Sequence, residues 1–194
     1  MTKLLTVDLR WTTDENRTIP HPFAKAMMTD RQFAVRLNLG KSYANDWEAP
    51  HLDVEDHPDA QPGLTDYIPS VPFEIVSIRF TNLLRSLGCD CEFLPLVVHY
   101  NGKVLEAEYF ALNVLQVLPS AVDLKRSVFD RYIQGANMAR GVSKLVLDES
   151  LTEAYPMSFL REITSVAVNE SVAQGIIQAN LVGIHLMKPG DYRS

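Results

Sequence analysis

Two segments of the chain, 92 residues apart, show the same pattern of a capped amphipathic helix followed by a strand. In the first, VSIRFTNLLRSLG, Ser77 stands where an N-cap is favoured. Apolar residues then follow at offsets of three, six, seven and ten, the spacing of one helix face: Phe80, Leu83, Leu84 and Leu87. Gly88 suits the left-handed residue that ends a helix. The extended segment CDCEFLPL comes next and predicts a strand.

The second segment, VNESVAQGIIQAN, repeats these offsets from Asn169. The matching positions hold Val172, Gly175, Ile176 and Ala179. Asn180 takes the place of Gly88, and asparagine is the other residue that tolerates left-handed backbone. The segment LVGIHLM then predicts a second strand. We therefore expect an internal pseudo-repeat of one helix and one strand, which is a single pair and not a solenoid.

Other segments predict further strands. KLLTVDLRW alternates apolar and polar residues, and LNVLQVL continues as a strand. Asn101 and Gly102, between VVHY and KVLEAEYF, suit a two-residue type I′ turn and predict a hairpin. SKLVLDES predicts a strand whose last residues, Asp148 and Glu149, cap the segment that follows. For HPFAKAMMTDRQFAVRL, helix and strand both remain open.

One more helix is expected in DLKRSVFDRYI, where Leu124, Val128 and Tyr132 stand at helical spacing. Taken together, these patterns predict the α+β class. We expect a mixed or antiparallel sheet, a few amphipathic helices and the helix–strand pseudo-repeat.

Negative charge is concentrated in one part of the chain. The formal net charge is −6, and the interval between Lys41 and Arg79 contains eight carboxylates and no lysine or arginine. Five of the eleven prolines fall within residues 41–72. Because proline removes a backbone donor and fixes φ, neither a helix nor a central strand is expected there. We predict an irregular, ordered loop or arm, anchored by four apolar residues: Trp47, Leu64, Tyr67 and Ile68.

Within this interval, residues 51–63 read HLDVEDHPDAQPG and resemble a metal site in composition only. The spacing of His51, Asp53, Glu55, Asp56 and His57 matches no loop motif for zinc, iron or calcium. The stretch is therefore interpreted either as a solvated acidic loop or as a surface that meets a basic partner.

Known catalytic signatures are absent from the sequence. There is no nucleophile elbow, zinc-protease motif, phosphate-binding loop or dinucleotide fingerprint. His99 and His185 fall within predicted strands and are interpreted as structural. Cys89 and Cys91 are interpreted as buried thiols in a reducing compartment, because cysteines at this spacing in a strand rarely bridge each other. Their acidic neighbours would raise their pKa, which argues against a reactive thiol. This profile favours a binding protein over an enzyme, and no metal or cofactor is expected.

Length and composition narrow the class of protein further. A chain of 194 residues, 46% of them hydrophobic, can bury a core without a disulfide or metal. The negative charge argues against a nucleic-acid partner. No apolar run reaches the length of a membrane span, and the first residues lack the apolar region of a signal peptide. A soluble, cytoplasmic protein is therefore expected, with its oligomeric state open.

The order of several short motifs resembles one family of bacterial immunity proteins from polymorphic toxin systems. This is immunity family eleven, formerly a domain of unknown function. The resemblance covers roughly residues 70–189 and rests on these residues: Val76, Ser77, Phe93, Pro95, Leu112 to Leu115, Asp123, Leu124, Ser127 and Leu145 to Ser150. The second helix–strand unit departs from the first, since it has Asn169 in place of serine and lacks the F-x-P ending.

The resemblance implies a non-enzymatic protein that binds a cognate secreted antibacterial toxin, often one delivered by a type VI or contact-dependent system. It implies the immunity-family α+β domain in residues 70–194. Residues 1–69 then form a variable part, with the acidic proline-rich segment at about 42–72, packed on that domain. The resemblance transfers no binding site.

The residues themselves suggest how a toxin would be bound. An acidic surface speeds encounter with a basic active-site cleft and occludes it. Our candidate partner-binding residues are four acids and two aromatic anchors: Asp53, Glu55, Asp56, Asp59, Trp47 and Tyr67. Two alternatives stay open. One is a metal-dependent hydrolase using the His51/His57 carboxylate cluster, and the other is a regulatory module that self-associates through its sheet edges.

Overall fold

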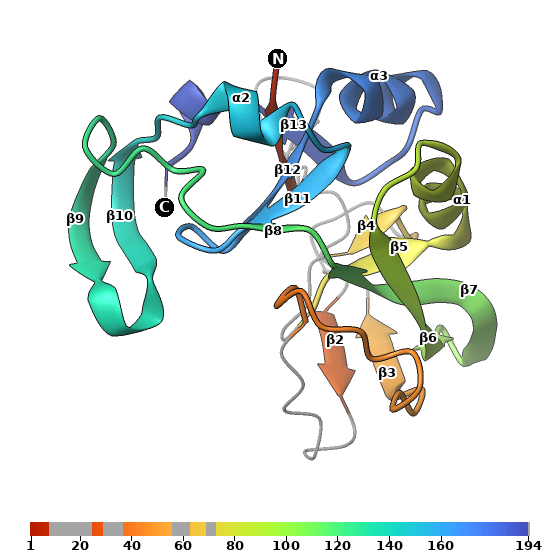
Figure 1. Cartoon of the computed structure of the whole chain (residues 1–194). Helices are drawn as coiled ribbons and strands as arrows, with labels where there is room; N and C mark the ends of the chain where they lie inside the picture. Colours follow the sequence, from red (N-terminus) through yellow and green to blue (C-terminus); the bar gives the residue numbers. More distant parts are fainter. Residues whose placement is uncertain (8–24, 29–36, 56–62, 69–72, 194) are drawn as a thin grey trace, which may run out of the picture.

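A computed structural model describes residues 1–7, 25–28, 37–55, 63–68 and 73–193 of the chain. The predicted α+β class is confirmed. The described strands form a five-stranded sheet, a six-stranded sheet and a separate two-stranded hairpin (Figure 1). The α-helices are α1 (Ile78–Ser86), α2 (Glu149–Thr152) and α3 (Glu170–Gln178). Two single turns of 3₁₀ helix span Gln134–Ala136 and Pro189–Asp191.

The six-stranded sheet has the order β2-β3-β6-β7-β5-β4. Its strands are β2 (Lys25–Met28), β3 (His51–Glu55), β6 (Cys91–Tyr100), β7 (Lys103–Val114), β5 (Ile75–Ser77) and β4 (Tyr67–Ile68). All neighbours are antiparallel except β3 and β6, which run parallel. The predicted hairpin joins β6 to β7, and Asn101 and Gly102 both have positive φ, as a type I′ turn requires.

The five-stranded sheet has the order β13-β1-β12-β11-β8. Its strands are β13 (Ile184–Met187), β1 (Lys3–Val7), β12 (Ser165–Val168), β11 (Met157–Leu160) and β8 (Val117–Leu118). Only β11 and β8 are parallel. The hairpin of β9 (Val128–Ile133) and β10 (Met138–Lys144) extends away beside this sheet.

The predicted pseudo-repeat is confirmed. Ser77 and Asn169 cap α1 and α3 by accepting the backbone N–H of Phe80 and Val172. Both nine-residue helices end in a Schellman motif, around Gly88 with φ of 68° and Asn180 with φ of 50°. In each unit, the last helical turn is therefore closed by the same pair of backbone hydrogen bonds.

The repeat is larger than the sequence suggested. The antiparallel strand orders β6-β7-β5-β4 and β13-β1-β12-β11 correspond, and the helix follows β5 in one unit and β12 in the other. The counterpart of β7 is β1, which comes from the opposite end of the chain. The first unit is thus contiguous in sequence, whereas the second is completed by the N-terminal strand.

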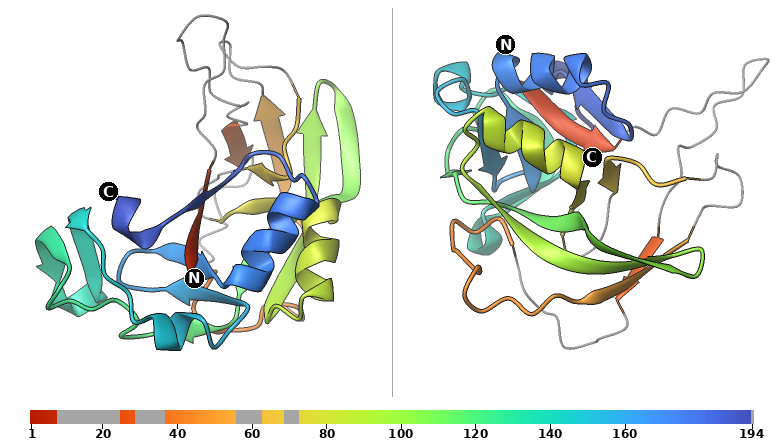
Figure 2. Two further views of the ribbon diagram at one scale, coloured as in Figure 1. Left: turned by 90° about the horizontal axis from the view of Figure 1, so that it is seen from above. Right: turned by 90° about the vertical axis from the view of Figure 1, so that its right-hand side faces the viewer.

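The two helices lie side by side and pack through unequal side chains (Figure 2). A Cβ added at Gly175 of α3 would lie 2.9 Å from a methyl group of Leu87 and 3.3 Å from one of Leu83. Gly175 occupies the repeat position that Leu83 has in α1. The large side chains of α1 therefore fit onto the small residue of α3, and the close approach depends on this glycine.

Buried apolar side chains form three clusters in the described part of the chain. The first lies between the helices and both sheets and includes Phe80, Leu84 and Ile176. The second covers the other face of the six-stranded sheet, around Leu52 and Phe73. The third lies between the five-stranded sheet and the β9–β10 hairpin.

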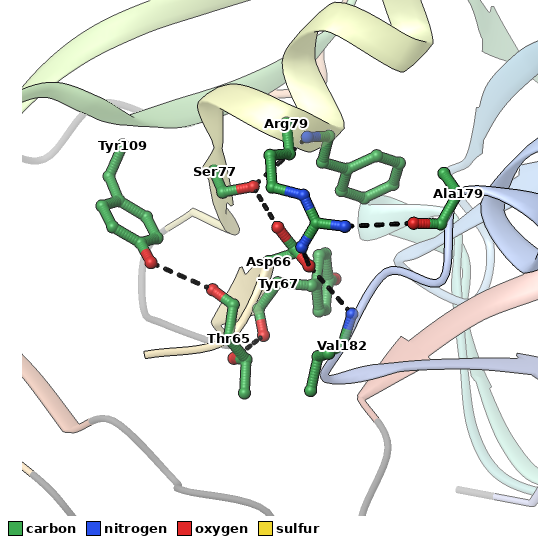
Figure 3. A network of polar contacts seen from close by, with 9 residues as sticks. Thr65, Asp66, Tyr67, Ser77, Arg79, Tyr109, Ala179 and Val182 are labelled. Atoms are coloured by element: carbon green, nitrogen blue, oxygen red, sulfur yellow. Dashed lines mark hydrogen bonds and ion pairs between the residues drawn. The ribbon is translucent and has the colours of Figure 1, made fainter. Parts of the chain in front are cut away.

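A polar network joins the two units (Figure 3). The Asp66 carboxylate accepts hydrogen bonds from the Ser77 hydroxyl (2.6 Å), the Arg79 guanidinium (3.0 Å) and the backbone N–H of Val182 (2.9 Å). Arg79 also donates to the carbonyl of Ala179, at the end of α3 (3.0 Å). One buried acid thus links the cap of α1 to the segment that leads into β13.

Both cysteines are free and half-buried against the first cluster. Burial raises the pKa of Cys89 to about 12 and raises that of Cys91 further. The interpretation of these residues as structural thiols is therefore consistent with their surroundings, since the reactive thiolate is disfavoured.

The expectation of an irregular loop over residues 41–72 is wrong in two places. His51–Glu55 forms β3, an interior strand between β2 and β6, and Tyr67–Ile68 forms β4. The prolines flank β3 but none lies within it, and Leu52 and Val54 alternate with polar residues. Lys25–Met28, left open between helix and strand, is β2.

The helix predicted for DLKRSVFDRYI is also wrong. Asp123 closes a turn by accepting the backbone N–H groups of Lys125 and Arg126, and β9 begins at Val128. The β-branched and aromatic residues from Val128 onward pair with β10 instead. The strand expected in SKLVLDES ends at Lys144, and Leu147 makes only an isolated bridge with Val122. Asp148 does cap α2, as expected.

Candidate functional site

Among the described residues, one face of the six-stranded sheet carries exposed and half-buried side chains on β3, β6 and β7, beyond the part that α1 covers. The opposite face is sealed by buried residues such as Leu52 and Val98. On the open face, the register brings alternate residues of the three strands together. We call these residues the acidic sheet face: His51, Asp53, Val97, His99, Val104, Glu106 and Glu108. All of them are exposed or half-buried.

Three carboxylates and two valines give this face its character. Asp53 lies opposite His99 across the parallel β3–β6 pair, and Glu106 lies opposite Val97 across β6–β7. Within the described part of the chain, no ion pair or hydrogen bond is recorded for the carboxylates of Asp53, Glu106 and Glu108. Val104 is 50% exposed beside them. Among the described residues, the face therefore offers negative charge without a paired cation, around an apolar patch on three paired strands.

Two histidine side chains also lie on the acidic sheet face. His51 Nδ1 lies 3.0 Å from His99 Nε2, and the ring centroids are 5.3 Å apart. A hydrogen bond at this distance requires a proton on one nitrogen and a lone pair on the other, so at least one ring is neutral in the pair. His57, the other histidine of the HLDVEDHPDAQPG stretch, lies outside the described residues.

The candidate residues chosen from the sequence are separated by the fold. Asp53 lies on the acidic sheet face, and Glu55 pairs in register with Lys25 of β2. Asp56 and Asp59 lie outside the described residues. Trp47 packs on the opposite side of the sheet, where its indole N–H donates to the carbonyl of Pro95 (2.8 Å) and its ring meets Phe73 edge-on.

The choice of Tyr67 as an aromatic anchor for a partner is wrong. Its side chain is 4% exposed and packs edge-to-face on Phe80, with ring centroids 6.5 Å apart. Desolvation by burial raises the pKa of Tyr67 well above its ordinary value. The ring belongs to the main core, since β4 pairs with β5 there, and it offers no surface to a second protein.

Sequence reasoning missed Glu106 and Glu108. They lie on β7, about fifty residues from Asp53, and reach the same face only through the β3–β6–β7 pairing. The alternation in KVLEAEYF carried a usable signal, because Glu106 and Glu108 share one face of a strand whose other face bears Leu105 and Tyr109.

The part of the acidic segment before β3 is held against β6 and β7. Glu92 accepts hydrogen bonds from the backbone N–H of Tyr43 (2.9 Å), from Asn113 (2.9 Å) and from the hydroxyl of Ser42. Burial would raise the pKa of Glu92, but these donors hold it below its usual value. Specific hydrogen bonds thus hold Ser42 and Tyr43, in the first part of the acidic segment, against the six-stranded sheet.

Comparison with known protein families identifies the family of this chain. A model of the immunity protein family Imm11 matches residues 7–191. The chain belongs to this family. A search of curated proteins found no match. The family match begins well before residue 70, so it takes in the acidic segment as well as the two repeated units.

Several residues that carry the family resemblance meet at one open pocket of about 650 Å³. Its lining consists of Ser120, Asp123, Arg126, Val146, Leu147, Asp148 and Glu149. The Arg126 guanidinium lies 2.6 Å from Asp123, and its hydrogen bonds lower the pKa of that carboxyl. Hydrogen bonds from Ser150 similarly lower the pKa of Asp148.

These contacts show what the family motifs do in this fold. Asp123 closes the turn before β9 and Asp148 caps α2. The Ser127 hydroxyl donates to the carbonyl of Val146 and accepts the backbone N–H of the same residue. Asp123 and Asp148 of the pocket are therefore engaged in a turn and a cap, whereas among the described residues no such contact is present for Asp53, Glu106 and Glu108. We regard the acidic sheet face as the better candidate for partner binding.

The described residues contain no group of three or more His, Cys, Asp or Glu side chains that could hold a metal ion. No helix in the described part of the chain is long and apolar enough to cross a membrane.

Proposed function

We propose that this chain neutralises a cognate secreted antibacterial toxin by binding a basic surface of that toxin through the acidic sheet face. The family supports an immunity role in general. The observation that carries the proposal is the open cluster of Asp53, Glu106 and Glu108, which lacks neutralising partners in the described part of the chain.

The first step is the encounter between the acidic sheet face and the toxin. Carboxylates on an open surface raise the association rate of a basic partner, and the effect weakens as salt screens the charges. Toxins that act on nucleic acids or nucleotides need basic clefts for phosphate. An acidic face lying over such a cleft would exclude the substrate, without any reaction by the immunity protein itself.

The second step is retention of the bound toxin. Val104 and Val97 lie among the charges, and apolar contact at the centre of an interface with a charged rim is the usual arrangement in stable complexes. Because the residues are held by three paired strands, little ordering is needed on binding. In this proposal, the protein acts inside the producing cell and binds a toxin that a type VI or contact-dependent system delivers.

The test uses the full chain and the product of the adjacent toxin gene. The two proteins should co-purify. The triple change Asp53→Lys, Glu106→Lys and Glu108→Lys should weaken binding by about a hundredfold or more and flatten its salt dependence. The measurement is a titration of the purified pair by calorimetry at two salt concentrations.

A matched control makes the same change in net charge elsewhere, at three exposed acids: Asp90→Lys, Glu149→Lys and Asp191→Lys. The control should bind within about threefold of the unmodified chain. An equal loss of toxin affinity in both variants would mean that the effect follows net charge alone and does not depend on the acidic sheet face. Loss in the control alone would move the binding surface to the pocket lined by Glu149 and remove the acidic sheet face from the mechanism.

A further inference from the structure

The β9–β10 hairpin and the turn before it carry the opposite charge. Residues 124–144 contain five basic residues and one acid, in a chain whose net charge is −6. The basic residues are Lys125, Arg126, Arg131, Arg140 and Lys144. Only Arg126 is paired with a carboxylate, that of Asp123, in the described structure. We call Arg131 and Arg140, which share one face of the hairpin, the basic hairpin surface.

The arrangement of these charges is unfavourable for the isolated chain. Arg131 and Arg140 are direct partners across the two strands, and both are exposed. Like charges at directly opposed positions repel. Among the described residues, neither guanidinium meets a carboxylate. Such a pair is relieved when a negatively charged surface covers it.

The hairpin is also open as a binding element. Its two strands pair only with each other, so each has an edge without a strand partner among the described residues. Arg131 and Arg140 share one face of the hairpin, whereas Val128 and the acid Asp130 lie on its other face. The face that bears the two arginines is therefore positively charged, the inverse of the acidic sheet face.

The two surfaces lie at different ends of the molecule. In Figure 1 the hairpin projects on the left, beside the five-stranded sheet, whereas β6 and β7 lie on the right. The left view of Figure 2 shows the same separation. The hairpin of one copy can therefore reach the acidic sheet face of another copy, but not its own.

We infer that the basic hairpin surface binds the acidic sheet face of a second copy of this chain, head to tail. Arg131 and Arg140 face Asp53, Glu106 and Glu108 of the second copy. A contact between two different surfaces of identical copies closes into a ring or grows into a chain. No toxin enters this contact, but it uses the acidic sheet face that the proposed function assigns to the toxin, so toxin binding and self-association exclude each other.

The test is sedimentation velocity on the full chain alone, from about 10 to about 300 µM, at roughly 20 mM and roughly 500 mM NaCl. This range of salt shortens the screening length from about 20 Å to about 4 Å. The mass should rise above the 21.8 kDa of one chain as concentration increases at low salt, and return to it at high salt.

Charge reversal identifies the two surfaces. Arg131→Glu with Arg140→Glu should give a monomer, and so should Asp53→Lys with Glu106→Lys. An equimolar mixture of the two variants should associate again, because the reversed surfaces complement each other. The control Lys41→Glu with Lys188→Glu changes the net charge by the same amount as the arginine variant. Both positions are exposed and lie outside the two surfaces, so this control should still associate.

The inference is overturned if the unmodified chain stays monomeric at low salt, if either variant associates as before, or if the mixture stays monomeric. A monomeric control would also overturn it, because the effect would then follow net charge alone. Toxin binding is measured in a separate titration, so failure of one proposal leaves the other intact.

Discussion

The guanidinium of Arg79 lies 3.0 Å from the carboxylate of Asp66, and the two residues differ sharply in exposure. The Asp66 side chain is 6% exposed, whereas that of Arg79 is 57% exposed. The acid is thus the buried centre of the seam between the two units, and the arginine covers it from the solvent side. The two partners should consequently differ in their effect on stability.

Asp66→Ala is expected to lower the free energy of unfolding by about 3 kcal/mol, because it removes the acceptor of three hydrogen bonds from a buried position. Arg79→Ala should cost about 1 kcal/mol, since its side chain is mostly in water and Asp66 keeps two donors. Urea unfolding followed by circular dichroism measures both. Similar losses for the two variants would contradict the assignment of Asp66 as the centre of the network.

Gly183→Ala should be strongly destabilising. The added Cβ would lie 2.6 Å from the Cβ of Thr65 and 2.8 Å from the backbone carbonyl of Tyr67, and φ at this position is +85°. Backbone cannot move aside as a side-chain tip can, so we expect a loss of about 2–4 kcal/mol. Gly190→Ala, where nothing lies within 4 Å, is the control and should change the unfolding free energy by less than about 0.5 kcal/mol.

Substitutions at Gly175 should depend on size. Gly175→Ala gains about 1 kcal/mol of helix propensity and requires only that the tip of Leu87 shift, so the net change should be within about 1 kcal/mol. Gly175→Leu would force α1 and α3 apart and should cost about 1–3 kcal/mol. Thermal unfolding of the two variants is the measurement. Equal stability of both would mean that the helices do not pack through this glycine.

Glu74 should make stability depend on pH. Desolvation by burial raises its pKa above the ordinary 4.5, although a hydrogen bond from Asn38 works in the other direction. A carboxyl whose pKa is raised by folding favours the folded state at low pH and loses that contribution as pH rises through the folded pKa. Glu74→Gln should therefore be more stable than the unmodified chain at pH 7.

This advantage should shrink as pH falls toward and below 4.5, because Glu74 is then protonated in both the folded and unfolded chains. Urea unfolding at pH 4 and pH 7 gives the comparison. Glu48→Gln, the same substitution at an exposed position, is the control. An advantage for Glu74→Gln that is larger at pH 4 would reverse the sign and refute the argument.

Local signals explain what could be predicted from the sequence. Ser77, Gly88, Asn169 and Asn180 identified both repeated helices, because caps and left-handed ends act within a few residues. The β6–β7 hairpin was predicted from an equally local signal, the turn residues Asn101 and Gly102. The helix expected at Leu124 failed because three residues at helical spacing also occur in a strand, and pairing with β10 decided the outcome.

Long-range pairing explains what could not be predicted. Flanking prolines suggested a loop around His51, but parallel pairing with β6 makes it an interior strand. The same pairing brings Glu106 and Glu108 to Asp53. It leaves Trp47 on the other side of the sheet. Tyr67 sits in a polar segment of sequence, and only the tertiary structure shows that it is core.

The origin of β1 has a consequence for how the chain reaches its native state. Leu4 pairs with both Ala167 and Met187, so the second sheet joins segments that lie far apart in the chain. Closing so long a loop is entropically costly and slows folding. The contiguous unit of β4 to β7 has every strand and α1 within about fifty residues and can form while the chain is still growing. During translation, β1 must wait for β12 and β13, and its exposed edge is then a vulnerable site for mispairing.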